Sequence, residues 1–198
     1  MSDVLVLSCS PRKGGNSDTL AEFFSSGVSH AGAEAKLLFL RDFHIRPCTA
    51  CGVCSTAPDN SCALGDGDDA ELLFSRMARS SMVVLCSPVY FYALPAVCKA
   101  FIDRAQRFWH SEKREAMRPF WSILVGARTR GDRLFEGSEL TLRYFGRAIG
   151  LSLTDCIHCY GYDAPHDVLR DSVRCAAMRA LGEKAGGIVL GKSECSPR

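Results

Sequence analysis

The sequence lacks any apolar run close to the roughly 18 residues that a membrane-spanning helix needs. It also lacks an excess of one charge, because 24 Lys and Arg face 22 Asp and Glu and leave a net charge of +2. This balance excludes the strongly basic surface that is typical of nucleic-acid-binding proteins, and it gives no attraction to an acidic membrane surface. We therefore expect neither a nucleic acid nor a membrane as a partner.

The beginning of the chain lacks the features of a secretory signal peptide. Residues 1–15 read MSDVLVLSCSPRKGG, with no basic start and only a short apolar stretch before the first charges. We therefore expect a cytoplasmic protein. The 198 residues, 47% of them hydrophobic, are enough for one globular domain with a sizeable core, and no repeat or linker divides them.

Cysteine, in contrast, is abundant, with 11 residues in the chain. In a cytoplasmic protein such a number indicates thiols, metal ligands or redox groups rather than a disulfide framework. Four of them gather between residues 48 and 62, and the others are scattered. Cys86 and Cys98 fall on apolar strand or helix faces, so we expect both to be buried, inert thiols.

Short apolar runs alternate with helical patterns along the chain, and this alternation predicts an α/β fold. Continuous apolar strands indicate a parallel sheet that is covered by helices on both faces. Five such units fit the strand order 2-1-3-4-5. The predicted strands cover 4–9, 35–40, 82–86, 120–125 and part of 151–160, the predicted helices cover 17–30, 68–79, 95–110, 137–149 and 166–185, and 41–67 is expected to be irregular.

The loop after the first predicted strand has the composition of an anion site. In the predicted order, strands 1 and 3 are neighbours, and ligands bind outside their carboxyl ends. Residues 8–17 read SCSPRKGGNS and lead directly into a helix, whose first N–H groups attract an anion. Asn16 or Ser17 is expected to cap this helix, and Ser10, Ser17 and Arg12 add hydrogen-bond donors.

An ordinary Gly-Gly turn followed by a helix cap is the alternative interpretation of this loop. Neither the Walker A pattern nor the G-x-G-x-x-G dinucleotide pattern is present in it. The phosphate of a mononucleotide is therefore the ligand that the loop favours.

Aromatic residues follow the third predicted strand, where residues 87–92 read SPVYFY. Pro88 has no N–H and favours an extended residue before it, so the N–H groups of Val89 and the residues after it are expected to be free to face a ligand. Tyr90 and Phe91 either line a flat ring there or pack beneath the next helix.

Three segments, SPRKGGNS, SPVYFYALPA and KAFIDR, resemble the NADPH-dependent FMN reductase family in their order and separation. The resemblance covers roughly residues 3–160. It implies a flavodoxin-like three-layer sandwich with the sheet order given above, and FMN as the cofactor.

The resemblance also implies which residues bind FMN. The loop at 126–129 would close one side of the flavin, although it holds fewer glycines than the family pattern. The implied phosphate ligands are Ser10, Arg12, Asn16 and Ser17, and the implied border of the isoalloxazine ring is formed by Pro88, Val89, Tyr90, Phe91 and Ala127.

Cys48, Cys51, Cys54 and Cys62 have the spacing C-x2-C-x2-C-x7-C. Thiolates at such intervals can converge on one soft metal centre. A [4Fe-4S] cluster, a zinc ion and unligated thiols are the three alternatives that the spacing leaves open. The spacing resembles that of the iron–sulfur flavoproteins, a branch of the same family, and this resemblance implies a [4Fe-4S] cluster near FMN.

Together these features predict an oxidoreductase that passes electrons from NADPH or NADH through FMN to a small-molecule or redox-protein acceptor. The flavin carries the chemistry, so no catalytic acid or base is expected. An iron–sulfur electron carrier and a redox-sensing module are the two other functions that the sequence allows.

Two further groups of residues have alternative interpretations. Arg128, Arg130 and Arg133 either contact nicotinamide phosphates or form a solvated loop. The end of the predicted helix, residues 108–110, either caps the flavin of a partner subunit or packs in the core. We expect a homodimer or homotetramer.

Overall fold

The structure is a computed structural model that describes residues 3–109 and 117–192. It contains a five-stranded sheet in the order β2-β1-β3-β4-β5, and all neighbouring strands are parallel. This confirms the predicted fold class and strand order. The strands are β1 (Asp3–Ser8), β2 (Glu34–Phe39), β3 (Met82–Pro88), β4 (Arg118–Gly126) and β5 (Leu151–Tyr160).

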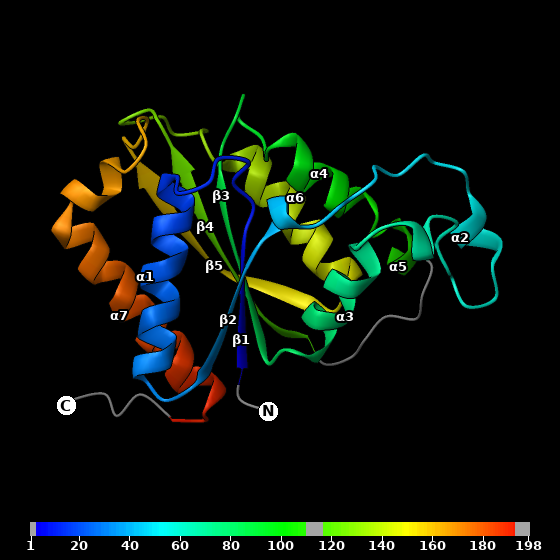
Figure 1. The fold of residues 1–198 in the computed structure, drawn as a ribbon, viewed down its shortest axis with the longest axis horizontal. Helices are drawn as coiled ribbons and strands as arrows, with labels where there is room; N and C mark the ends of the chain where they lie inside the picture. The colour runs from blue at the N-terminus through cyan, green and yellow to red at the C-terminus, as the bar shows by residue number, and fades with distance from the viewer. Residues whose placement is uncertain (1–2, 110–116, 193–198) are drawn as a thin grey trace.

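Helices cover both faces of the sheet, as Figure 1 shows. One face is covered by α1 (Asn16–His30) and α7 (Ser172–Val189). The opposite face is covered by α3 (Ala70–Arg79), α4 (Ala96–Asp103) and α6 (Glu136–Ala148). Among the described residues, no helix is long and apolar enough to cross a membrane.

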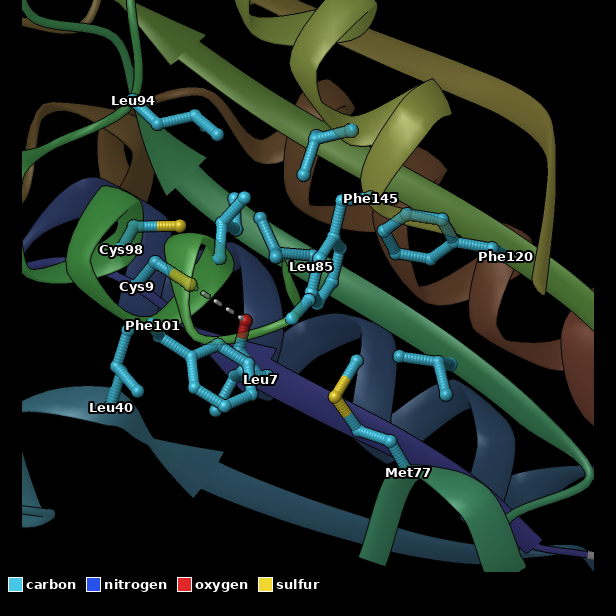
Figure 2. Close-up of a cluster of buried hydrophobic side chains, with 14 of the residues drawn as sticks. Leu7, Cys9, Leu40, Met77, Leu85, Leu94, Cys98, Phe101, Phe120 and Phe145 are labelled. Atoms are coloured by element: carbon cyan, nitrogen blue, oxygen red, sulfur yellow. Dashed lines mark hydrogen bonds between the residues drawn. The ribbon is translucent and has the colours of Figure 1, made fainter. Parts of the chain in front are cut away.

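Alternating strand side chains supply the two cores. In β1, Val4 and Val6 pack toward α1 and α7, whereas Leu5 and Leu7 pack toward α3 and α4. Figure 2 shows the second of these clusters, in which Phe101 of α4 lies over β1 and β3. Because the central strands are buried on both faces, they need the continuous apolar sequence that made them recognisable.

The predicted helix 95–110 is interrupted, so its single span was wrong. Helix α4 ends at Asp103, and a separate short helix, α5, covers Gln106–Trp109. Between them the backbone N–H of Arg104 donates to the carbonyl of Phe101 at 3.1 Å, which is the tighter i→i−3 pattern. The turn lets the Arg104 side chain enter the protein interior, where it pairs with Asp68. His110 lies outside the described residues.

Two other predicted segments also differ from the structure. The last helix was predicted to begin at residue 166, but a short 3₁₀ turn, η3 (Asp167–Arg170), precedes α7. Asp171 then caps α7 by accepting a hydrogen bond from the backbone N–H of Arg174 at 2.8 Å. Segment 41–67 is not wholly irregular. It begins within the 3₁₀ turn η1 (Leu40–Asp42), and it contains the short helix α2 (Val53–Thr56) and the 3₁₀ turn η2 (Gly65–Gly67).

Helices α1 and α7 approach each other at two glycines. A Cβ atom on Gly27 would lie 1.9 Å from the carbonyl oxygen of Arg179, and one on Gly182 would lie 2.0 Å from that of Phe24. Both contacts are with backbone atoms, which cannot rotate away as a side chain can. The absence of a side chain at these positions therefore sets the spacing of the two helices.

We predict that Gly182→Ala lowers the free energy of unfolding by about 1–3 kcal/mol, because the added methyl forces the helices apart. The midpoint of thermal unfolding should fall by roughly 2–4 °C for each kcal/mol. Gly187→Ala is the matched control in the same helix, since its nearest neighbour is 4.0 Å away. It should leave the stability unchanged or raise it by up to about 1 kcal/mol. Equal midpoints for the two variants would contradict the close packing.

Candidate functional site

The loop between β1 and α1 leaves the first turn of α1 without a side-chain cap. Gly15 is the N-cap, and no side chain bonds there, so the predicted capping by Asn16 or Ser17 is wrong. Gly14 has φ +67°, a left-handed conformation that glycine adopts without strain. The first N–H groups of a helix have no partner within it, so they remain suited to an anion.

Asn16 does not cap the helix because its side chain is engaged elsewhere. Its Nδ2 donates to the carbonyl of Ala164 at 2.9 Å, and its Oδ1 accepts from the backbone N–H of Val168 at 3.1 Å. These two bonds tie the start of α1 to the segment that follows β5. The side-chain amide of Asn16 therefore fixes the shape of the site. Only the backbone N–H of Asn16 remains at the helix start for a ligand.

The carboxylate of Asp18 holds the loop between β1 and α1 in place. It accepts a hydrogen bond from Ser8 Oγ at 2.6 Å and from the backbone N–H of Gly14 at 2.8 Å. Arg41 forms an ion pair with it at 2.9 Å and also donates to the carbonyl of Ser10 at 3.3 Å. A buried carboxylate needs such partners, and here they come from three different segments of the chain.

A cavity of about 150 Å³ opens at the carboxyl edge of the sheet, between the loops that follow β1, β3, β4 and β5. All the residues predicted to bind FMN line it, except Phe91. Within the described residues, the buried Oγ of Ser17 has no hydrogen-bond partner. An unpartnered buried hydroxyl beside a helix N-terminus fits a bound phosphate. The lining is Ser10, Arg12, Gly15, Asn16, Ser17, Pro88, Val89, Tyr90, Val125, Ala127, Tyr162 and Asp163.

The aromatic loop after β3 is a tight turn. Tyr90 and Ala93 exchange backbone hydrogen bonds of 2.9 and 3.0 Å, and the two residues between them have φ of +51° and +62°. Such left-handed conformations cost roughly 1–2 kcal/mol for each residue that is not glycine. Phe91 at the tip is wholly exposed, so the alternative that it packs beneath the next helix is wrong.

The same loop corrects the prediction of free N–H groups near the flavin. The N–H of Val89 donates to the carbonyl of Val125 at 2.8 Å, and that of Tyr90 donates to Ala93. These bonds extend the sheet and close the turn. The backbone here can therefore border a ring by contact, but neither N–H is available to it.

The arginines after β4 lie at the surface. Arg128 hydrogen-bonds to the hydroxyl of Tyr92, and its guanidinium lies 5.9 Å from the centre of that ring. Arg133 pairs with Glu136 at 2.6 Å. Residues 128–132 line an open recess of about 530 Å³. Arg133 is thus engaged with the first residue of α6, Glu136, whereas Arg128 joins the loop after β4 to the aromatic turn.

The residues at the end of α5 divide between core and surface. Phe108 packs edge-on against Phe74, with 4.9 Å between ring centres, so the core alternative holds for it. Trp109 is 64% exposed. Its ring lines a shallow recess between α4, α5 and α6.

The four clustered cysteines line a second cavity, of about 390 Å³, together with Arg104 and Arg107. Cys51 precedes α2, and hydrogen bonds from the backbone N–H of Val53 and from Thr49 lower the pKa of its thiol. In the part of the chain that the structure describes, no group of three or more potential ligands already has a metal-binding arrangement. The cavity therefore gathers the thiols without fixing them in a coordination geometry.

The two cavities are separate within one chain, because they share no lining residue. Figure 1 shows α2, drawn in cyan, at the opposite side of the molecule from α1 and the loops after β3 and β4. The cysteines therefore do not border the predicted flavin pocket of their own chain.

Comparison with known proteins decides the family, because residues 2–149 match the NADPH-dependent FMN reductases. The chain belongs to this family. Membership makes it an FMN-dependent oxidoreductase. The iron–sulfur flavoprotein of Methanocaldococcus jannaschii is 26% identical and aligns over 94% of this chain and 96% of that protein.

Two solved structures show the same flavodoxin-like fold. An NAD(P)H:quinone oxidoreductase from Methanothermobacter marburgensis has a TM-score of 0.68 at 18% identity, covering 91% of this chain and 97% of that one. An FMN-dependent NADH-azoreductase from Bacillus anthracis, in complex with FMN, has a TM-score of 0.65 at 13% identity, covering 93% and 99%.

In this FMN reductase, the structure adds site residues that the sequence did not reveal. Asp18 and Arg41 hold the loop between β1 and α1, and Tyr162 and Asp163 complete the cavity wall. Asp18 could have been noticed from the sequence, because an acidic residue in the first turn of a helix is a common local pattern. No local pattern pointed to Arg41, Tyr162 or Asp163, because the strand order, and not the neighbouring sequence, brings them to the cavity.

The remaining described cysteines of this FMN reductase include several buried, inert thiols, as predicted for Cys86 and Cys98. Burial raises the pKa of Cys86 well above the usual range, and it raises that of Cys159 to about 11. A thiol that resists ionisation is a poor nucleophile and a poor metal ligand. His158, which had no predicted role, pairs with Glu139 and stacks on Phe135 at 4.4 Å.

We predict that Ser17→Ala raises the dissociation constant of FMN by about tenfold or more, because a hydrogen bond to a charged group contributes about 1.5–3 kcal/mol. Riboflavin, which has no phosphate, should bind wild type and variant equally. Without ligand, Ser17→Ala should not lower the midpoint of thermal unfolding, since it removes an unpartnered polar atom. Fluorescence titration with both ligands measures the difference.

Ser25→Ala is the matched control for this measurement. Ser25 lies in the same helix, its Oγ is also buried without a hydrogen-bond partner, and it does not line the cavity. FMN should bind this variant as it binds wild type. Equal weakening of FMN and riboflavin by Ser17→Ala would show that Ser17 does not contact the phosphate.

Proposed function

We propose that this FMN reductase accepts hydride from NADPH or NADH on bound FMN and reduces a flavin, a quinone or a redox-protein acceptor. The observation that carries the proposal is the cavity at the carboxyl edge of β1 and β3. There, a helix N-terminus, an unpartnered buried hydroxyl and an aromatic turn surround one space. This combination supports binding of a phosphorylated ring compound.

The phosphate of FMN would lie against the start of α1. Arg12 and Ser17 would donate side-chain hydrogen bonds, and Asn16 would contribute its backbone N–H. Ser10 would line the phosphate site, while its hydroxyl donates to the carbonyl of Arg12 at 3.0 Å and shapes the loop. The helix dipole adds a partial positive charge at this end. Asp18 lies behind the loop, but Arg41 neutralises its charge, so a phosphate would not face an uncompensated carboxylate.

The flavin ring would extend beyond the cavity, because 150 Å³ is less than the volume of a typical pocket for a ligand of this size. Pro88, Tyr90 and Ala127 would border the ring, and the exposed Phe91 would lie beside its open side. When bound, FMN accepts a hydride at N5 and passes electrons on. The residues of the chain bind and orient it and leave one ring face open to the nicotinamide.

Arg128 and Arg130 would bind the phosphates of the nicotinamide cofactor. Both line the open recess after β4, and Arg128 contacts the aromatic turn. Arginine forms bidentate contacts with phosphate, and an exposed arginine can do so without losing a buried partner. These contacts support a nicotinamide site beside the open side of the flavin.

We also propose that the protein works in a reducing compartment such as the cytoplasm, as a homodimer or homotetramer. All the described cysteines are free thiols, which fits reducing conditions. The exposed aromatic side chains of Phe91, Tyr92 and Trp109 give surfaces that a second copy or an acceptor can cover.

We predict that heating releases one FMN per chain, and that NADPH or NADH bleaches the flavin absorbance in anaerobic stopped-flow measurements. The reduced flavin should then be reoxidised by a quinone. Release of FAD, or an apo-protein that does not bind FMN, would overturn the cofactor assignment. A bound flavin that neither nicotinamide reduces would favour an electron carrier instead.

A second proposed function is an iron–sulfur flavoprotein that exchanges single electrons through a [4Fe-4S] cluster. The observation that favours it is the cavity lined by Cys48, Cys51, Cys54 and Cys62. Four thiols are the usual donors of such a cluster. A zinc ion, with Zn–S bonds of about 2.3 Å, would leave much of a 390 Å³ cavity unfilled. The relative from M. jannaschii, which bears this name, aligns with nearly the whole chain.

We predict that Cys51→Ser abolishes iron and sulfide binding but leaves FMN bound and reducible by the nicotinamide. Transfer to a one-electron protein acceptor should fall sharply, whereas transfer to a quinone should persist. Cys156→Ser is the matched control, because Cys156 is also partly exposed but lies outside the cavity. If the four cysteines are unligated thiols, wild type will contain no iron and both variants will retain both activities.

A further inference from the structure

The side chain of Arg104 is buried at the wall of the cysteine cavity. It comes from the turn between α4 and α5, and its guanidinium has no solvent exposure. Its Nη1 donates to the carbonyl of Arg46 at 3.1 Å and to the carboxylate of Asp68. Arg104 thereby joins the two ends of the segment that carries the cysteines.

Two of the three guanidinium nitrogens do not take part in this structural role. Nε and Nη2 are buried and, among the described residues, have no hydrogen-bond partner. An arginine has five N–H donors and no acceptor, so leaving these donors unsatisfied in the interior is costly.

The positive charge of Arg104 is only partly compensated by Asp68, so an anion beside it would be stabilised. Asp68 is shared, because its carboxylate accepts the backbone N–H groups of Arg46 at 2.9 Å and Ala70 at 3.0 Å. Burial disfavours the charge on Arg104, but Asp68 and Cys62 outweigh burial and raise its pKa above the ordinary value. Arg107, which also lines the cavity, is paired with Glu71. Arg104 and Cys62 line the same cavity, so the two guanidinium nitrogens without a partner among the described residues lie at the wall of the space that holds the thiols.

We propose that Arg104 is a positioning residue for the cysteine-bound cluster, to whose sulfur atoms its Nε and Nη2 donate hydrogen bonds. This inference rests on the proposed [4Fe-4S] function. Reduction adds negative charge to the sulfurs, so donors directed at them stabilise the reduced form and raise the reduction potential. Arg104 thus both closes the cysteine segment and sets the potential at which the cluster accepts an electron.

The test is an EPR-monitored redox titration of anaerobically reconstituted protein, with iron, sulfide and FMN quantified per chain. Arg104→Lys keeps a cation for Asp68 but loses the planar guanidinium. At a fixed potential its ratio of reduced to oxidised cluster should fall about tenfold, which corresponds to about 59 mV for one electron. Arg104→Met should shift it in the same direction, and if that variant fails to fold, Arg104→Lys decides.

Lys99→Gln is the matched control, because it removes a positive charge from α4, the helix that ends directly before Arg104. Lys99 is half-exposed, pairs with Asp103 and does not line the cysteine cavity. Its cluster potential should equal that of wild type. Unchanged potentials in both Arg104 variants, with iron, sulfide and FMN retained, would overturn the role of Arg104 alone. An equal shift in Lys99→Gln would do the same. Reconstituted wild type without iron and sulfide would overturn both the cluster and this inference.

Discussion

The ion pair between Asp18 and Arg41 determines the geometry of the cavity where we propose that FMN binds. A buried carboxylate is stable only with enough donors, and Asp18 obtains them from β1, from the loop between β1 and α1 and from the segment after β2. The pair therefore forms only when β1 and β2 lie side by side. It fixes the loop before any ligand binds, so little ordering entropy is lost on binding.

Asn16 connects this loop to the opposite part of the sheet. Its side chain bonds residues 148 and 152 positions later in the sequence, beyond the end of β5. The cavity is consequently built from four loops that the parallel order brings to one edge. Each loop is short, and each is anchored to its neighbours by backbone hydrogen bonds, such as that from Val89 to Val125.

The sequence predicted the sheet order because its apolar strands alternate with helices, and five such units fit the doubly wound arrangement. It predicted an anion loop because glycines and hydroxyl residues directly before a helix are a local pattern. The break after α4 escaped it, because Arg104 turns inward to reach Asp68, 36 residues away. The helix cap was misassigned for the same reason, since the partners of Asn16 are distant in sequence.

The two cavities differ in how much of their shape the fold supplies. The cavity proposed for FMN is held by strands and by the Asp18–Arg41 pair. The cysteine cavity is formed largely by a segment whose only α-helix, among the described residues, is the four-residue α2. That segment closes where the backbone N–H of Arg46 donates to the carboxylate of Asp68 at 2.9 Å, and Arg104 binds both residues. Because its ends are already joined, the entropic cost of bringing the four thiols together is smaller. Metal binding would then complete the order that the closed segment begins.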